Sequence, residues 1–181
     1  MRRRLRFPLP ALALAVGLAL LGSGCMGYRL GTGAEAPLAF STLHVAPVKM
    51  RALVPQAEAV ITGAVREAFA NDGRVALAAH PATAGAVLEI TVRSYRRETA
   101  TADPEDTGLA RKLSVVLLAE LTLRAGEGAE TPAKTYFRAR PIEVRRDIFI
   151  DSGQQQAEYQ ALPLLAQDLA DKALHAVLDT W

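Results

Sequence analysis

The longest regular pattern in the chain is an alternation of apolar and polar residues across residues 110–124. Every second residue from Leu113 to Leu123 is apolar, and the other positions are mostly polar, such as Lys112 and Glu120, with Val116 and Leu118 among them. A period of two indicates a strand that is buried on one face. A helix is a rival interpretation of these leucines, but alternation over so many residues favours a strand.

Two neighbouring segments alternate in the same way and predict partners for this strand. They are residues 86–98 and 135–144. Because short polar connections link the three segments, we expect them to pair antiparallel. The polar and basic residues expected opposite the apolar faces of these two segments are Arg93, Tyr95, Arg97, Tyr136, Arg138 and Arg140.

Two further segments carry apolar residues at spacings of three and four, which is typical of amphipathic helices. The first is residues 55–71, where Pro55 suits the first turn and Gly73 suits the position after the last. The second is residues 154–181, in which Pro163 should kink or divide the helix. Its apolar stripe comprises Tyr159, Leu162, Leu165, Ala166, Leu169, Ala173, Val177 and Leu178.

The order of these segments predicts the fold class. Residues 41–48 and 74–78 read as short strands, whereas residues 145–153 follow no clean period. We predict an α+β two-layer sandwich, in which two amphipathic helices cover one face of a mostly antiparallel sheet of four to five strands. An antiparallel sheet can expose its other face to water, and here that face would carry the basic side chains.

Residues 1–24 predict a secretory signal peptide. Four arginines lie within the first six residues, and the apolar stretch that follows is too short to span a bilayer comfortably. Removing this segment lowers the basic count from 21 to 17 against 19 acidic residues, so the formal charge changes from +2 to −2. The basic pI therefore gives no reason to expect binding to nucleic acid.

Cys25 is the only cysteine, and it directly follows the small residues Gly22, Ser23 and Gly24. A buried thiol is the alternative interpretation, but this position predicts the lipidation site of a bacterial lipoprotein, with a diacylglycerol and a fatty acid such as palmitate. Two or more acyl chains hold a protein stably on a membrane. We therefore expect a lipidated N-terminus and tether over residues 25–38 and a single α/β domain over residues 39–181.

The residues that could carry chemistry do not form a catalytic pattern. His44, His80 and His175 fall in three different elements without the spacing of metal ligands. The acidic residues between Asp103 and Asp106 lie in a Pro-containing loop, and a hydrolase would have to depend on them. We predict no enzyme activity, no metal and no cofactor beyond the covalent lipid on Cys25.

The basic residues of the strands are the candidate binding residues. Guanidinium groups bind phosphate through paired hydrogen bonds, and lipopolysaccharide is the abundant phosphorylated amphiphile of a bacterial outer membrane. The alternative is ordinary solvated charge, balanced by glutamates on the same strands. The candidates for lipopolysaccharide binding are Arg93, Arg97, Lys112, Arg138 and Arg140.

Four stretches of the chain carry a resemblance to a known family. They are Cys25 with Gly27-Tyr28-Arg29-Leu30, the strand Val45-Ala46-Pro47-Val48, the helical segment from Ile61 to Phe69, and the run from Gln156 to Leu162 that leads to Leu169-Ala170. Together they resemble the LptE family of lipopolysaccharide-assembly lipoproteins, over nearly the whole chain after the predicted signal peptide.

The resemblance implies an α/β domain inside the lumen of LptD, a large outer-membrane β-barrel of Gram-negative bacteria. Such a domain plugs the barrel, assists its assembly and contacts lipopolysaccharide on its way to the cell surface. It would lie on the periplasmic side of the outer membrane, held by its lipid anchor. The alternative function is a periplasm-facing lipoprotein that scaffolds or activates a peptidoglycan or secretion machine.

Overall fold

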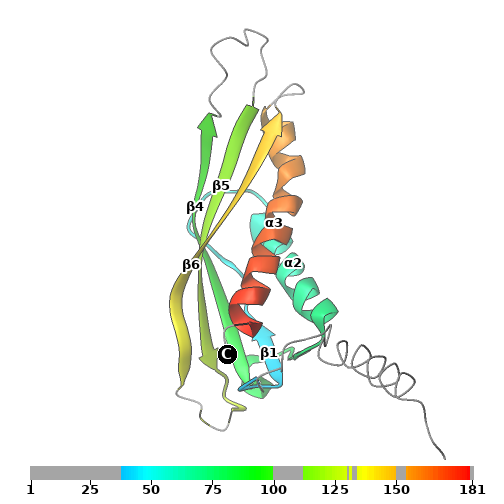
Figure 1. Ribbon diagram of the computed structural model, residues 1–181, viewed down its shortest axis with the longest axis vertical. Coiled ribbons are helices and arrows are strands. Elements are labelled where there is room, and N and C mark those ends of the chain that lie inside the picture. Colours follow the sequence, from blue (N-terminus) through cyan, green and yellow to red (C-terminus); the bar gives the residue numbers. More distant parts are fainter. Residues whose placement is uncertain (1–37, 100–111, 130, 132–133, 150–153, 180–181) are drawn as a thin grey trace, which may run out of the picture. The chain divides into compact units, whose positions relative to one another are not determined.

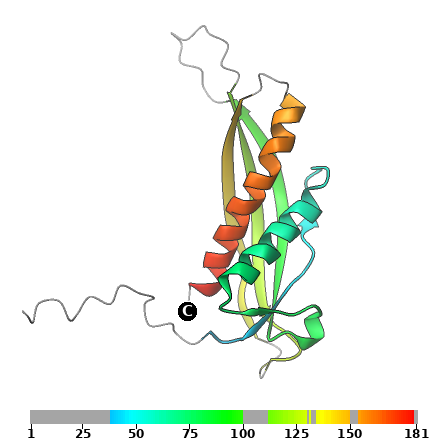
Figure 2. The same ribbon diagram turned by 90° about the vertical axis from the view of Figure 1, so that its right-hand side faces the viewer.

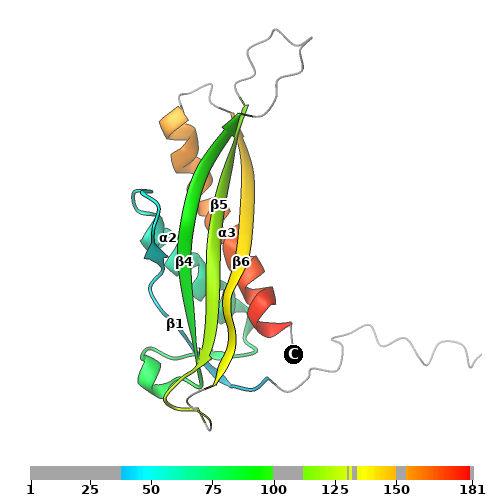
Figure 3. The same ribbon diagram turned by 90° about the vertical axis from the view of Figure 1, so that its left-hand side faces the viewer.

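The two helices lie side by side over one face of a twisted sheet, and the opposite face of the sheet is open (Figure 1 and Figure 3). The computed structural model describes residues 38–99, 112–129, 131, 134–149 and 154–179. The predicted signal peptide, Cys25 and the acidic loop at Asp103 lie outside these residues. The two-layer α+β arrangement follows the prediction, with both helices on the same face (Figure 2).

Three long strands form the body of the sheet. They are β4 (Ala86–Thr99), β5 (Lys112–Ala125) and β6 (Thr135–Phe149), and each pairs antiparallel with the next. The predicted antiparallel pairing is therefore confirmed. The predicted apolar face of β5 is the buried one, because Val115, Leu117 and Leu121 are fully buried beneath the helices.

The remaining strands are short and parallel, which the sequence did not predict. β1 (Thr42–Val45) and β2 (Lys49–Met50) both pair parallel with β4, and β3 (Ala76–Leu77) pairs parallel with β1. The sheet is thus mixed and has six strands, in the order β3-β1-β4-β5-β6 with β2 also beside β4. A parallel pair needs a crossover connection, and the helix between β2 and β3 provides it.

Helix α2 (Ala57–Asp72) ends where the sequence predicts. Ile61, Val65 and Phe69 are fully buried and form its core face. Gly73 adopts φ 75°, and its N–H donates to the carbonyl oxygen of Phe69 at 3.4 Å. A left-handed residue after the last turn is a common helix stop that glycine adopts without strain.

Helix α3 (Gln154–Leu178) runs unbroken past Pro163. The predicted division of the helix is therefore wrong. Tyr159 also departs from the predicted apolar stripe, because its side chain is exposed and its hydroxyl donates to the side-chain oxygen of Gln56. The other members of the stripe are buried: Leu162, Leu165, Ala166, Leu169, Ala173, Val177 and Leu178.

Strand β6 is longer than the sequence indicates. It continues through Arg145 to Phe149, where no periodicity predicted a strand, because β5 supplies partners along its whole length. Ile148 pairs with Leu113, and Phe149 pairs with Lys112. Between β3 and β4, a short 3-10 helix, η1 (Pro81–Thr83), occupies the predicted loop.

Candidate functional site

A bulge in β4 decides on which face its basic residues lie. Val92 pairs with Ala119 of β5, but the next pair is Ser94 with Leu118, so Arg93 is an extra residue. One extra residue reverses the alternation of every side chain that follows. Tyr95 therefore faces the helices together with Leu117, and the prediction that Arg93, Tyr95 and Arg97 share one face is wrong.

Strand β6 has a second irregularity at Arg138 and Ala139. Leu121 pairs with Arg140, whereas Leu123 pairs with Phe137, so two residues of β6 lie opposite one of β5. Ala139 adopts φ 51°, and its N–H donates to the hydroxyl of Thr122 at 3.1 Å. This bulge places Arg140 on the helix face, against the prediction that it shares the open face with Arg138.

The open face of the sheet is a lattice of ion pairs that link neighbouring strands or reach from β4 to β6 across β5. Arg93 meets Glu120 at 2.6 Å, and Lys112 meets Asp147 at 2.7 Å. Lys112, followed by the hydroxyl of Ser114, holds the pKa of Asp147 below its usual range. The other pairs are Arg145 with Glu98, Arg96 with Glu143, and both Lys49 and Arg124 with Glu89. Six cations and five carboxylates therefore alternate across this face.

These charged side chains also cover apolar surface. Val116 lies on the open face but is fully buried, with Arg96 and Arg145 directly opposite it on the flanking strands. The aliphatic stems of arginine commonly pack over apolar neighbours while their charged ends stay in water. The open face is thus polar and nearly neutral rather than uniformly basic.

On the helix face, Arg97 and Tyr95 contact Glu158 of α3. Arg97 donates two hydrogen bonds to the Glu158 carboxylate, at 2.6 and 2.8 Å, and these hold the pKa of that carboxyl below its usual range. Burial, followed by the nearby Glu158 charge, raises the pKa of Tyr95 to about 12. This cluster joins the first turns of α3 to the sheet.

Strand β6 is attached to α3 by a similar set of contacts. Arg146 donates two hydrogen bonds to Asp168, at 2.6 and 2.7 Å. The guanidinium of Arg140 lies over the ring of Phe137 at 4.4 Å and donates to the backbone oxygen of Ala176 at 2.9 Å. Arg140 therefore serves the attachment of α3, and it is not an open-face cation.

The five candidate binding residues do not form one patch. Arg93 and Lys112 lie on the open face, about 20 Å apart along the strands at 3.3 Å per residue. Arg97 and Arg140 face the helices. Arg138 is exposed in the β6 bulge, and among the described residues its guanidinium has no hydrogen bond or ion pair. Alternation alone could not reveal this arrangement, because neither bulge contains a glycine or proline.

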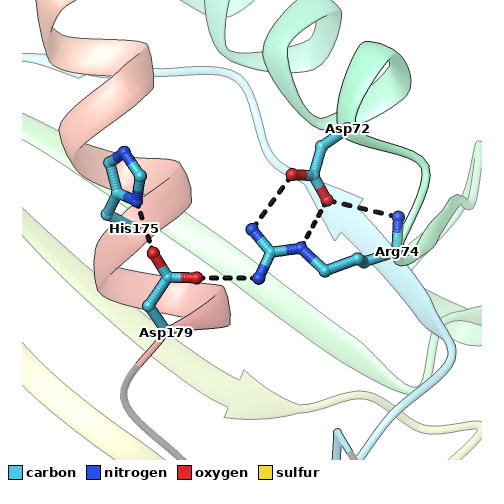
Figure 4. A network of polar contacts seen from close by, with 4 residues as sticks. All are labelled: Asp72, Arg74, His175 and Asp179. Carbon is cyan, nitrogen blue, oxygen red and sulfur yellow. Dashed lines mark hydrogen bonds and ion pairs between the residues drawn. The ribbon is translucent and has the colours of Figure 1, made fainter. Parts of the chain in front are cut away.

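A separate network joins the C-terminal ends of the two helices (Figure 4). Arg74 meets Asp72 at 2.8 Å and Asp179 at 2.7 Å, and His175 contacts the other oxygen of Asp179. His175, and then Arg74, hold the pKa of Asp179 below its usual range. The network is exposed, and through Arg74 it fastens the end of α2 to the end of α3.

The described residues contain no group of three or more His, Cys, Asp or Glu side chains that could hold a metal ion. His44 is instead a structural residue, because its Nδ1 lies 3.0 Å from the carbonyl oxygen of Ala78, just after β3. A groove runs between α2 and the loop before it, and most of its lining is apolar, including Pro47, Met50, Leu53 and Val54. None of the described helices is long and apolar enough to cross a membrane.

Comparison with known proteins identifies the family. The model of the LptE family, described as lipopolysaccharide-assembly, matches residues 40–177 of the chain. The chain belongs to the LptE family. This confirms the resemblance seen in the sequence. The match covers every described strand and all but the last residue of α3, so the LptE domain is the whole helix-covered sheet.

Solved structures share the fold of this LptE-family chain at low sequence identity. A Xanthomonas campestris protein is 14% identical with a TM-score of 0.55, over 84% of this chain and 91% of that chain. A minor lipoprotein from Acinetobacter baumannii is also 14% identical, with a TM-score of 0.51 over 79% and 94% of the two chains. No curated protein matches in sequence. The likeness extends to the fold alone.

Proposed function

We propose that this LptE-family chain is an outer-membrane lipoprotein that occupies the lumen of an LptD-like β-barrel. There it would assist assembly of the barrel and the transport of lipopolysaccharide to the cell surface. The family match over residues 40–177 carries the proposal. The nearly neutral lattice of ion pairs on the open face supports it, since the interior of a large membrane barrel is polar.

Attachment to the membrane is assigned to Cys25. The chain would be cleaved before this residue and lipidated on its sulfur, with residues 25–38 as the tether. Replacing Cys25 by Ser should leave the protein unprocessed or release it from the outer-membrane fraction, because no acyl chains would be attached. Mass spectrometry of the wild-type protein should show the lipid mass at the N-terminal peptide, and an unmodified thiol would contradict the assignment.

The partner can be tested by affinity purification from detergent-solubilised outer membranes, followed by mass spectrometry. We expect a large β-barrel to co-purify in a one-to-one ratio, and depletion of the chain to reduce lipopolysaccharide at the cell surface. The alternative function predicts a different result. Recovery of peptidoglycan synthases or secretion proteins, with lipopolysaccharide export intact, would favour a scaffold for another envelope machine.

Direct contact with lipopolysaccharide is assigned to the sequence-predicted cations, with Arg138 as the principal contact. Arg93 and Lys112 would have to exchange a carboxylate partner for a phosphate, whereas Arg138 has no partner to give up among the described residues. Arg97 and Arg140, on the helix side, would likewise have to give up Glu158 and the backbone oxygen of Ala176 before they could contribute. No catalytic step is required for this function.

A matched pair of charge reversals tests this contact. Arg138→Glu should weaken binding to lipopolysaccharide micelles several-fold in low salt, and added salt should reduce the difference by screening. Arg51→Glu is the control, because Arg51 is also exposed and has no side-chain partner among the described residues. Equal losses in the two variants would show that only net charge matters, and no loss in either would remove the case for Arg138.

A further inference from the structure

Strand β4 has one edge that is paired along only half of its length. β2 accompanies β4 as far as Val92, whose carbonyl oxygen accepts the N–H of Arg51 at 2.9 Å. From Ser94 to Thr99, β4 pairs with β5 on one side, and among the described residues no strand pairs with it on the other. In Figure 3, this half of β4 forms the outer margin of the sheet.

The ladder defines which backbone groups face the open side. Val92 directs its carbonyl oxygen away from β5, toward Arg51. Ala119 of β5 pairs with Val92, and Leu117, two residues away on β5, pairs with Tyr95. Ala119 and Leu117 therefore direct their backbone groups to the same side of β5. Because hydrogen-bonded and non-bonded pairs alternate along an antiparallel ladder, Tyr95 and Arg97 direct their N–H and C=O groups to the open side. No described residue bonds to these four groups.

The other long edge of the sheet, on β6, is protected. Pro141 has no N–H, the bulge at Ala139 interrupts the strand, and Lys172 of α3 donates to the backbone oxygen of Glu143 at 2.7 Å. These are recognised means of preventing strand addition at an edge. On β4, none of these devices occurs between Ser94 and Thr99, so this edge is a ready template for a further strand.

The charges beside this edge favour an acidic partner. Arg51 has no side-chain partner among the described residues, and the single ion pair of Arg96 is stretched to 4.0 Å. Both are exposed. Among residues 94–99, a second copy of this edge could offer only one carboxylate, that of Glu98, which Arg145 already holds at 2.8 Å. Carboxylates on an added strand would instead meet the guanidinium of Arg51, unpaired among the described residues, and the exposed, weakly paired guanidinium of Arg96.

We propose that an extended, acidic segment of a partner protein adds to the edge of β4 at residues 94–99 and continues the sheet. Its backbone would bond to Tyr95 and Arg97, which gives affinity, and its Asp or Glu side chains would meet Arg51 and Arg96, which gives selectivity. The inference does not depend on the proposed function, because the edge and its charges are properties of the folded chain.

The test uses the full chain and a soluble peptide of alternating Glu and Val, with a Lys–Val peptide as control. The acidic peptide should slow amide hydrogen exchange at Tyr95 and Arg97, and the basic peptide should not. Arg97→Pro and Arg97→Ala both lose the ion pair with Glu158. Only Arg97→Pro also loses the N–H that points to the open side, and neither variant removes a backbone bond to β5. We expect binding to be about tenfold weaker in the Pro variant than in the Ala variant.

Three results would overturn the proposal: unchanged exchange at Tyr95 and Arg97, equal binding of both peptides, or equal affinity of the Pro and Ala variants. Should Arg97→Pro fail to fold, the double reversal Arg51→Glu with Arg96→Glu tests the charge selectivity, and it should exchange the preference for the two peptides. A fourth contradicting result would be concentration-dependent dimers that Arg97→Pro abolishes, since these would identify a second copy as the occupant. The peptide assay contains neither barrel nor lipopolysaccharide, so its failure is separate from a failure of the proposed function.

Discussion

At the scale of single residues, partner choice separates the basic side chains into different roles. Arg97 holds Glu158 and so fastens α3 to the sheet, Arg93 holds Glu120 across two strands, and Arg138 stays exposed in a bulge. All three are arginines, and all three lie on strands with an amphipathic sequence. Their roles differ because each bulge sets the direction in which the guanidinium points.

The Arg97–Glu158 pair makes stability depend on pH in a defined direction. The folded-state pKa of Glu158 is lowered from 4.5, chiefly by Arg97, so its stabilisation is present above that pH and is lost as pH falls through the folded-state value. Glu158→Gln should lower the free energy of unfolding by about 1 kcal/mol at neutral pH. The difference from wild type should vanish in strong acid, as measured by urea denaturation.

Glu67→Gln provides a control for this prediction. Glu67 is exposed on α2, and it has no ion pair among the described residues. Its replacement should therefore change the free energy of unfolding much less at neutral pH. A Glu158→Gln difference that stays constant from neutral pH to strong acid would contradict the role assigned to the ion pair.

The left-handed conformation of Ala139 predicts a stabilising substitution. A side chain at φ 51° is strained, and glycine adopts this conformation freely. Ala139→Gly should raise the free energy of unfolding by about 0.5 kcal/mol. This is the net effect of the strain relieved in the folded state and the larger conformational entropy that glycine gives the unfolded chain. Ala76→Gly, at an exposed strand position with ordinary φ, should lower it by about 0.5 kcal/mol. The same sign for both, in thermal or urea unfolding, would rule out strain at Ala139.

At the scale of elements, α3 and the bulged strands determine each other's positions. Arg97 and Tyr95 reach the start of α3 only because the β4 bulge turns them toward the helices. Arg140 reaches Ala176 near its end because of the bulge in β6. Two irregularities on different strands thus provide the polar attachments at both ends of one helix.

Two glycines in different elements predict opposite effects of the same substitution. Gly63 lies inside α2, where an added Cβ would meet no atom within 4 Å, so Gly63→Ala should stabilise the protein by about 1 kcal/mol. At Gly126 a Cβ would lie 1.9 Å from the carbonyl oxygen of Ala84, beside the 3-10 helix. Gly126→Ala should therefore destabilise by about 3 kcal/mol. Thermal unfolding of both variants tests the contrast, and a neutral Gly126→Ala would contradict the close approach.

At the scale of the whole molecule, stability is concentrated in the three long strands. β5 has paired neighbours on both sides, and Val115, Val116 and Leu117 are buried on both of its faces. β2 and β3 contribute two residues each and lie at the margin of the sheet. The long antiparallel strands and the helices packed on them therefore form the most stable part of the molecule.

Native-state hydrogen exchange should reveal this distribution. Amides in the middle of β5 should exchange only through global unfolding, whereas those of β2 and β3 should exchange through local opening, at rates higher by orders of magnitude. Measuring exchange across a denaturant series separates the two routes. Equal protection in β3 and β5 would mean that the sheet opens as one unit.

Prediction from sequence succeeded where one physical signal was strong. The alternation in β5 gave its buried face, and the glycine after α2 gave the end of that helix. Prediction failed where a segment's structure depends on a pairing partner that is distant in sequence. β6 extends to Phe149 because β5 pairs with it. The short strands are parallel because α2 crosses over between them. Tyr159 has helical spacing but lies beyond the width of the packed face.

The sequence by itself determined the two helices, the three antiparallel strands, the predicted lipidation cysteine and the LptE family, because each depends on residue types at short spacings. Only the tertiary structure decided which arginines face the helices, that the open face is nearly charge-balanced, and that half of one edge of β4 has no strand beside it among the described residues. These features depend on bulges and on pairing between distant segments. A bulge moves each later side chain to the other face without changing the composition of the strand.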